Sequence, residues 1–136
     1  MISPDPTEPK FALFDYIDEH GNNDIKIWTQ GLQKTQQAKL NVRLDMLKKL
    51  GSELFPHVLT DTPTSGIQKI RVKGKVQLRP MLCKGPINKE KEFTLLIGAK
   101  EIGSCFDPKK ADEKAKDRKQ IINKNPNRRR PHERVS

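Results

Sequence analysis

Six lysine and arginine side chains, and no aspartate or glutamate, lie between residues 62 and 88. Over residues 68–73 the cations alternate with apolar residues, which is the period-two pattern of a half-buried β-strand. Since the side chains of a strand point alternately to its two faces, three cations would share one face, and Ile70 and Val72 would point to the other. The six cations are Lys69, Arg71, Lys73, Lys75, Arg79 and Lys84.

A tight turn at Gly74 would fold residues 76–79 back along this strand as the second half of a β-hairpin. If the turn is short, Gln77 and Arg79 join the face that carries Lys69. The sequence therefore predicts a basic platform with an apolar back. Like charges on neighbouring strands repel each other, and a bound polyanion relieves that repulsion. The alternative is a solvated surface without a ligand.

Such a platform suits phosphate chemistry, because arginine holds a phosphate through two parallel hydrogen bonds and lysine acts as a point charge. A metal-independent ribonuclease must deprotonate a 2′-hydroxyl, stabilise a phosphorane and protonate the leaving oxygen. Clustered cations stabilise the phosphorane, and they lower the pKa of a neighbouring lysine so that it becomes a candidate general base. This hypothesis requires that the cations lie on one side of the hairpin and that no neighbouring carboxylate pairs with them.

The whole chain is basic, with a formal net charge of +10, although its first 24 residues hold six acids and one lysine. A basic body attracts polyanions by its summed field and by counterion release, so we expect a nucleic-acid partner. No run approaches the ~20 apolar residues of a membrane span, and the N-terminus lacks the charged and apolar regions of a signal peptide. We therefore expect a cytoplasmic protein with no membrane partner, in which Cys83 and Cys105 are reduced thiols.

Other chemistry has little support in the sequence, which contains no GxGxxG, P-loop or HExxH motif. The three histidines lack the spacing of metal ligands, so we expect no metal and no cofactor. His57 is the histidine nearest the predicted platform, with either a catalytic or a structural role. Phe106 precedes a predicted helix, where its ring could stack on a base or pack on that helix.

Apolar periodicity and turn residues divide the chain into short elements. Asn23 or Asp24 can cap the first helix, and Asp107 before Pro108 is typical of the start of the last one. The expected class is α+β: a small antiparallel sheet with two N-terminal helices and a C-terminal helix, packed on one face. The predicted elements are a strand over 10–18, helices over 24–32 and 35–50, strands over 68–73, 76–79 and 92–98, and a helix from 107 to about 123.

A chain of 136 residues favours one domain. Three prolines without apolar periodicity predict a flexible leader over residues 1–9. The segment 125–136, NPNRRRPHERVS, is expected to be a basic flexible tail. The single domain would then span residues 10–124.

Over residues 25–125 the chain resembles the RelE/ParE toxin superfamily, most closely its phage-derived RelE-like branch near HigB. The resemblance rests on the helical hairpin 25–50, the strands GIQKIRVKG, VQLRPML and FTLLIGAKE, and the segment DPKKADEKAKDRK before the last helix. It implies a small antiparallel sheet preceded by two helices. It also implies a toxin that cleaves messenger RNA in the ribosomal A site without a metal, and that a cognate antitoxin neutralises.

Position by position, the resemblance implies that Lys69, Arg71, Arg79 and Lys100 are catalytic. Lys73, Lys75, Lys84 and Phe106 are the further candidates for contacts with nucleic acid. Two departures from the family's pattern bear on the chemistry. Phe106 lies near the family's C-terminal tyrosine but has no hydroxyl, and Glu101 places a carboxylate where such toxins are usually basic. That carboxylate could serve as a base or weaken phosphate binding.

Two other functions remain open at this point. A non-catalytic inhibitor of DNA gyrase, in the manner of ParE, would act through a protein surface and leave the basic hairpin incidental. A nucleic-acid-binding module without toxicity would use the hairpin for binding alone. The row of cations favours the ribonuclease and the binding module over the gyrase inhibitor.

Overall fold

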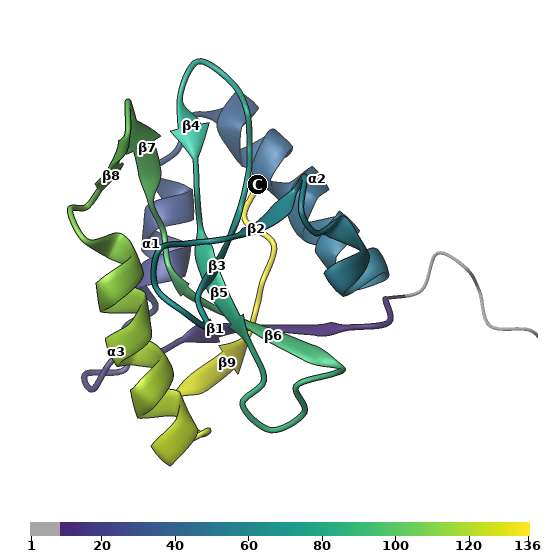
Figure 1. The fold of residues 1–136 in the computed structure, drawn as a ribbon, viewed down its shortest axis with the longest axis vertical. Helices are drawn as coiled ribbons and strands as arrows, with labels where there is room; N and C mark the ends of the chain where they lie inside the picture. Colours follow the sequence, from purple (N-terminus) through teal and green to yellow (C-terminus); the bar gives the residue numbers. More distant parts are fainter. Residues whose placement is uncertain (1–8) are drawn as a thin grey trace, which may run out of the picture.

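Three α-helices and two β-sheets make up residues 9–136, the part of the chain that the computed structural model describes (Figure 1). The α+β class is confirmed, and the predicted leader lies outside the described residues except for Pro9. In chain order the elements are β1 (Ala12–Tyr16), α1 (Asp24–Gln30), α2 (Lys34–Leu50), the 3-10 helix η1 (Gly51–Leu54), β2 (Leu59–Asp61), β3 (Gln68–Ile70), β4 (Gln77–Leu78), β5 (Met81–Lys84), β6 (Glu92–Ile97), β7 (Lys100–Ile102), β8 (Cys105–Asp107), α3 (Ala111–Lys124) and β9 (Arg129–Pro131).

The main sheet has the strand order β2-β3-β5-β6-β1-β9, and β4, β7 and β8 form a small second sheet. Neighbouring strands of the main sheet are antiparallel except β1 and β6, which pair in parallel with Leu13 opposite Phe93. The expectation of a purely antiparallel sheet is therefore wrong at this pair. Between β1 and β6 the chain crosses over through α1, α2 and the outer strands, and a parallel pair requires such a crossover.

Local signals set the start of the first helix and the end of the second as predicted, whereas α1 ends two residues early and α2 begins one residue early. The Asn23 side chain caps α1 by accepting a hydrogen bond from the Lys26 amide at 2.9 Å, and Gly51 ends α2 with a φ of 54°. The last helix differs from the prediction, because Asp107 belongs to β8 and α3 begins only at Ala111. Pairing of β8 with β7 satisfies the backbone at Asp107 and so delays the helix.

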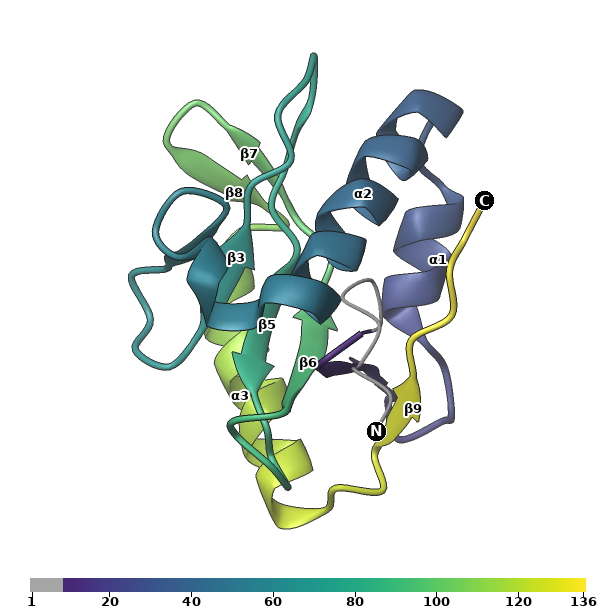
Figure 2. The same ribbon diagram turned by 90° about the vertical axis from the view of Figure 1, so that its right-hand side faces the viewer.

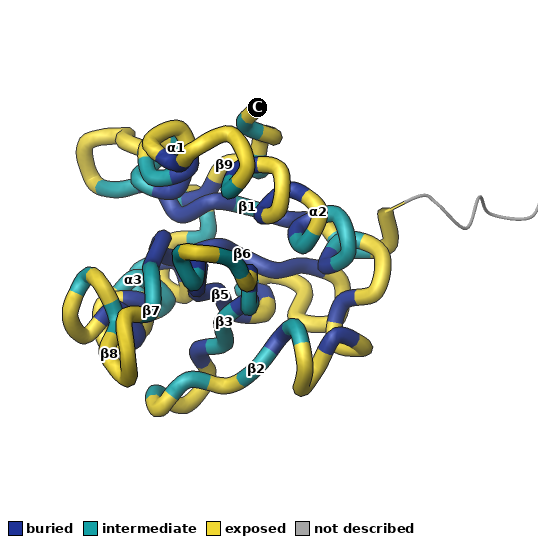
Figure 3. Tube along the Cα trace, turned by 90° about the horizontal axis from the view of Figure 1, so that it is seen from above, coloured by how far each residue is buried: buried dark blue, intermediate teal, exposed yellow. Residues whose placement is uncertain are grey.

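Helices cover both faces of the main sheet, so the expectation that they share one face is also wrong (Figure 2). On one face, α1 contributes Ile25 and α2 contributes Leu40 and Leu44 to the core. On the other face, α3 contributes Ala115 and Ile122. Every residue of β6 is buried, as a strand covered on both sides requires. Seen from above, buried stretches run along β1, β5 and β6 between the helices (Figure 3). No helix in the described part of the chain has the length and apolarity to cross a bilayer.

The C-terminal segment is ordered against the domain, contrary to the flexible tail expected over residues 125–136. β9 pairs with β1, and Arg129 forms a buried ion pair with Glu92 of β6. His132 Nδ1 lies 2.8 Å from Asp15 Oδ1, and both side chains are buried. Backbone pairing and buried polar partners therefore hold a segment whose composition alone suggests a solvated tail.

Gly98 lies directly against Trp28, and an alanine Cβ there would be 2.1 Å from indole Cδ2. We expect Gly98→Ala to lower the free energy of unfolding by about 1–3 kcal/mol, because the ring or the strand must shift. Gly31→Ala is the matched control, since its Cβ would meet nothing closer than the Trp28 carbonyl oxygen at 3.5 Å. Urea unfolding followed by the fluorescence of the single tryptophan measures both variants. Equal stability of the two variants would show that the indole is not confined.

Candidate functional site

The strand register brings four of the singled-out side chains to one face of the sheet. Val72 lies opposite Leu78 in an antiparallel bridge, so Arg71 comes opposite Arg79. Lys69 pairs with Met81 on the same two segments. In the small sheet, Glu101 lies between Gln77 of β4 and Phe106 of β8. Since directly paired residues point to the same face, the register aligns the four side chains Lys69, Arg79, Glu101 and Phe106.

These four side chains, which we call the Glu101 cluster, are linked by successive contacts from Arg79 through Glu101 and Lys69 to Phe106. Arg79 Nε donates to Glu101 Oε2 at 3.0 Å, and Lys69 Nζ lies 3.6 Å from Glu101 Oε1. The Lys69 ammonium is also 5.0 Å from the centroid of the Phe106 ring, which is within cation–π range. The cluster therefore joins a carboxylate, two cations and an aromatic face from three separate parts of the chain.

The expectation that the hairpin cations are free of carboxylates is wrong for Lys69 and Arg79. The Arg79 side chain is only 7% exposed, and its other nitrogens donate to Leu78 O at 2.8 Å and Gln77 Oε1 at 3.0 Å. The pairing was not visible in the acid-free stretch because Glu101 comes from β7, outside it. Arg79 is thus a buried residue that orients Glu101, and it is not a free phosphate ligand.

Arg71 lies beside the cluster, and no carboxylate within residues 9–136 neutralises its guanidinium. It is partly buried, and its side chain makes no ion pair or hydrogen bond with any of residues 9–136. At the hairpin turn, Lys73 and Lys75 are exposed. The Lys39 ammonium of α2 lies close to the same turn, 3.2 Å from where a Cβ on Gly74 would be. The surface next to the cluster is therefore positively charged.

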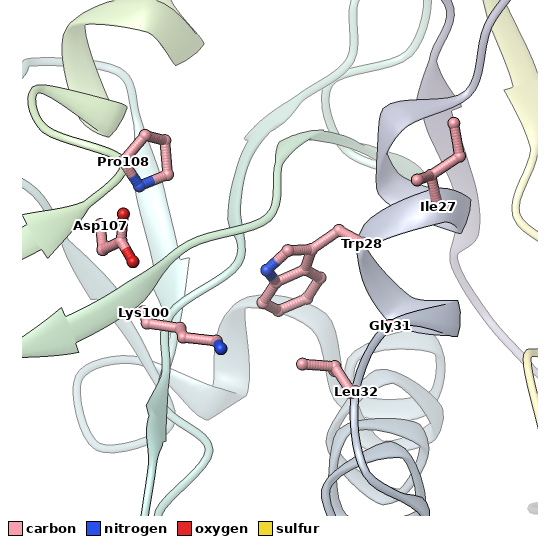
Figure 4. A pocket seen from close by; sticks show the side chains of 7 residues that line it. All are labelled: Ile27, Trp28, Gly31, Leu32, Lys100, Asp107 and Pro108. Carbon is pink, nitrogen blue, oxygen red and sulfur yellow. The ribbon is translucent and has the colours of Figure 1, made fainter.

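Two predicted site residues lie elsewhere. Lys100 precedes Glu101 in β7, so its side chain points to the opposite face, where it lines a cavity with Trp28 (Figure 4). Lys84 lies at the far end of β5 and lines a depression with Lys89 and Lys119. The structure therefore does not bring Lys100 or Lys84 to the Glu101 cluster.

The sequence did not indicate the cavity beside Phe106, which has a volume of about 580 Å³. Pro63, Ile102 and Phe106 give it apolar walls, and Lys109 and Lys110 stand among its lining residues. Ile102 is 65% exposed. The period-two alternation of Lys100, Glu101 and Ile102 is the sequence signal that could have separated the two faces of β7.

None of the histidines joins the cluster. His20 and His57 are exposed, and His132 is buried against Asp15 on the other side of β6. Within residues 9–136, no three histidine, cysteine or acidic side chains are grouped closely enough to hold a metal ion. The chemistry available at the site is therefore that of a carboxylate, ammonium and guanidinium groups.

The two cysteines should differ sharply in reactivity. Burial raises the pKa of the Cys83 thiol to about 11, whereas Cys105 is exposed in β8. Because the thiolate is the nucleophile, we expect a disulfide reagent at pH 8 to modify one thiol per native chain and two in guanidinium chloride. In Cys105→Ser the fast native reaction should vanish. A fast reaction that survives in this variant would place Cys83 within reach of solvent.

No model of a known protein family matches this chain, and no curated protein or solved structure matches it either.

Proposed function

We propose that this protein is a RelE-like toxin, an endoribonuclease that cleaves messenger RNA in the ribosomal A site without a metal. Because Lys69 and Arg79 pair with Glu101, a row of free cations no longer supports this proposal. It is carried instead by the convergence of Glu101 with Lys69, Arg79 and Phe106, beside Arg71, which has no acidic partner within residues 9–136. The resemblance to the superfamily supports it. So does the order of elements, in which two helices precede the hairpin and one helix follows β8.

In the proposed mechanism Glu101 is the general base. Its carboxylate accepts the proton of a 2′-hydroxyl as that oxygen attacks the adjacent phosphorus and the bond from phosphorus to the 5′-oxygen breaks. The Lys69 ammonium gives a proton to the leaving 5′-oxygen. The products are a 2′,3′-cyclic phosphate and a 5′-hydroxyl. The carboxylate takes the role that a deprotonated lysine would otherwise fill.

The remaining residues bind and position. Arg71 holds the non-bridging oxygens, whose charge grows in the phosphorane. Arg79 is a positioning residue. Its hydrogen bonds to Leu78 O and Gln77 Oε1 hold the guanidinium in place, and its hydrogen bond to Glu101 then fixes the direction of that carboxylate. Phe106 offers its ring as a stacking surface for a base. The Lys69 ammonium lies beside the same ring. Lys73 and Lys75 contact the RNA backbone from the turn.

The proposal implies three partners: the ribosome, its messenger RNA and a cognate antitoxin. It also places the protein in the cytoplasm, where ribosomes translate. We expect the antitoxin to cover residues 69–84, either with acidic side chains or with a docked helix. A complex that left this surface open would mean neutralisation at another face.

A nucleic-acid-binding module without catalysis is the second candidate. One observation favours it: Glu101 pairs with two of the cations and so reduces the charge available to a scissile phosphate. Binding through Arg71, Lys73 and Lys75 does not need a free Lys69 or Arg79. The two candidates therefore differ in cleavage, not in affinity for RNA.

The deciding experiment expresses the protein alone and follows growth, transcript cleavage by primer extension and plasmid supercoiling. We expect growth arrest with cuts in phase with codons. Arg71→Ala should abolish the cuts, because one phosphate ligand contributes about 2–4 kcal/mol to stabilising the transition state. Arrest with relaxed or damaged DNA would indicate a gyrase inhibitor, and the absence of arrest would favour the binding module.

A further inference from the structure

A second candidate site lies on the opposite face of β7, between α1 and the β7–β8 hairpin. It is a cavity of about 330 Å³, within the range of roughly 300–1,000 Å³ usual for small-ligand sites. Trp28 and Leu32 line one side, and Lys100, Asp107 and Pro108 line the other (Figure 4). The Glu101 cluster does not use any of these side chains.

The aromatic wall of this cavity is held in place. The Trp28 ring packs against Gly98, where even a Cβ would lie 2.1 Å away, so the indole cannot move toward the sheet. Next to it, Ile27 is 59% exposed and adds an apolar edge to the cavity. A confined indole at the mouth of an open cavity is a stacking surface for a flat ring.

The polar wall carries two opposite charges that are not paired with each other. Lys100 and Asp107 are register partners on β7 and β8, yet no ion pair joins them or ties either to another side chain within residues 9–136. In Figure 4 the ammonium, the carboxylate and the indole nitrogen turn toward the same space. A ligand there would meet two donors and one acceptor beside an aromatic ring.

We propose that this cavity binds a nucleotide unit, with the nucleobase against Trp28 and its phosphate at Lys100. The Asp107 carboxylate would accept a hydrogen bond from the exocyclic amine of adenine or cytosine. The net charge of +10 favours such an anionic ligand. A free nucleotide and a nucleotide within single-stranded RNA share this chemistry. The inference is independent of the proposed cleavage, because binding here needs no ribosome.

Trp28 gives a direct measurement, since it is the only tryptophan in the chain. The full-length protein is titrated with AMP, UMP and a single-stranded ribohexanucleotide, and indole emission is recorded. We expect saturable quenching that Lys100→Gln weakens about tenfold, as for the loss of one charged hydrogen bond. Lys116→Gln is the matched control, because it removes the same charge from an exposed side chain of α3, the helix on the other face of the main sheet, and it should change affinity less than twofold.

Asp107→Asn provides a second test that does not depend on Lys100. It should weaken AMP binding while leaving UMP binding unchanged, because uracil has no exocyclic amine. AMP that binds as tightly as the hexanucleotide would identify a free nucleotide as the ligand, and binding of the hexanucleotide alone would identify RNA. The proposal is overturned if no probe quenches saturably, or if Lys100→Gln and Lys116→Gln weaken binding equally.

Discussion

Glu101→Gln should reduce the rate of ribosome-dependent cleavage by about 10²–10⁴-fold, the usual contribution of a general base. Glutamine keeps the shape of the side chain and can still accept a hydrogen bond from Arg79 Nε, but it cannot take a proton from a 2′-hydroxyl. Single-turnover cleavage of a defined transcript on translating ribosomes measures the rate. Binding to those ribosomes should change little, because the substitution removes the base and keeps Arg71.

Glu90→Gln is the matched control, since it makes the same chemical change at an exposed residue outside the cluster. It should cleave at the wild-type rate. If Glu101→Gln also cleaves at that rate, Glu101 is not the base. Unchanged cleavage would then leave the carboxylate with only the structural role of pairing Lys69 and Arg79.

The largest effect on stability is expected at the buried pair between Arg129 and Glu92, whose side chains are 5% and 9% exposed. Arg129→Met should lower the free energy of unfolding by about 3–5 kcal/mol, because it leaves the buried Glu92 carboxylate without its cationic partner and with only the backbone amides of Ile87 and Asn88. Arg134→Met is the control, since Arg134 pairs with Asp45 at 2.7 Å on the surface and should contribute only about 0–1 kcal/mol. Urea unfolding measures both. Equal losses would mean that the C-terminal segment is not anchored by the buried pair.

Patterns within a few residues predicted the fold class, the first two helices and part of the strands. The apolar period of α2, the cap at Asn23 and the alternation at Ile70 and Val72 each depend only on near neighbours, and the structure has all three. The class and the helices before the hairpin follow from such patterns. The parallel pairing of β1 with β6 does not, because it depends on where a long crossover returns.

The site was predicted only in part, because local patterns do not show which distant segments pair. Alternation placed Lys69 and Arg79 on one face, as the register has them. It could not show that Glu101, more than 20 residues beyond Arg79, folds back between them. Lys100 was assigned to the site by the family resemblance, although its alternation with Glu101 places it on the other face of β7. The prediction of a flexible tail was wrong because three consecutive arginines are typical of a solvated segment, whereas Arg129 forms a buried ion pair with Glu92.

The position of β1 has a consequence for synthesis of the chain. β1 leaves the ribosome well before its neighbours β6 and β9, and Tyr16 pairs with Arg129. The nascent protein must therefore hold an apolar strand without a sheet partner until β6 has been synthesised, and without its second partner until residue 129 has been added. A truncated translation product that stops before residue 129 would release a chain with an open sheet edge, prone to association and to proteolysis.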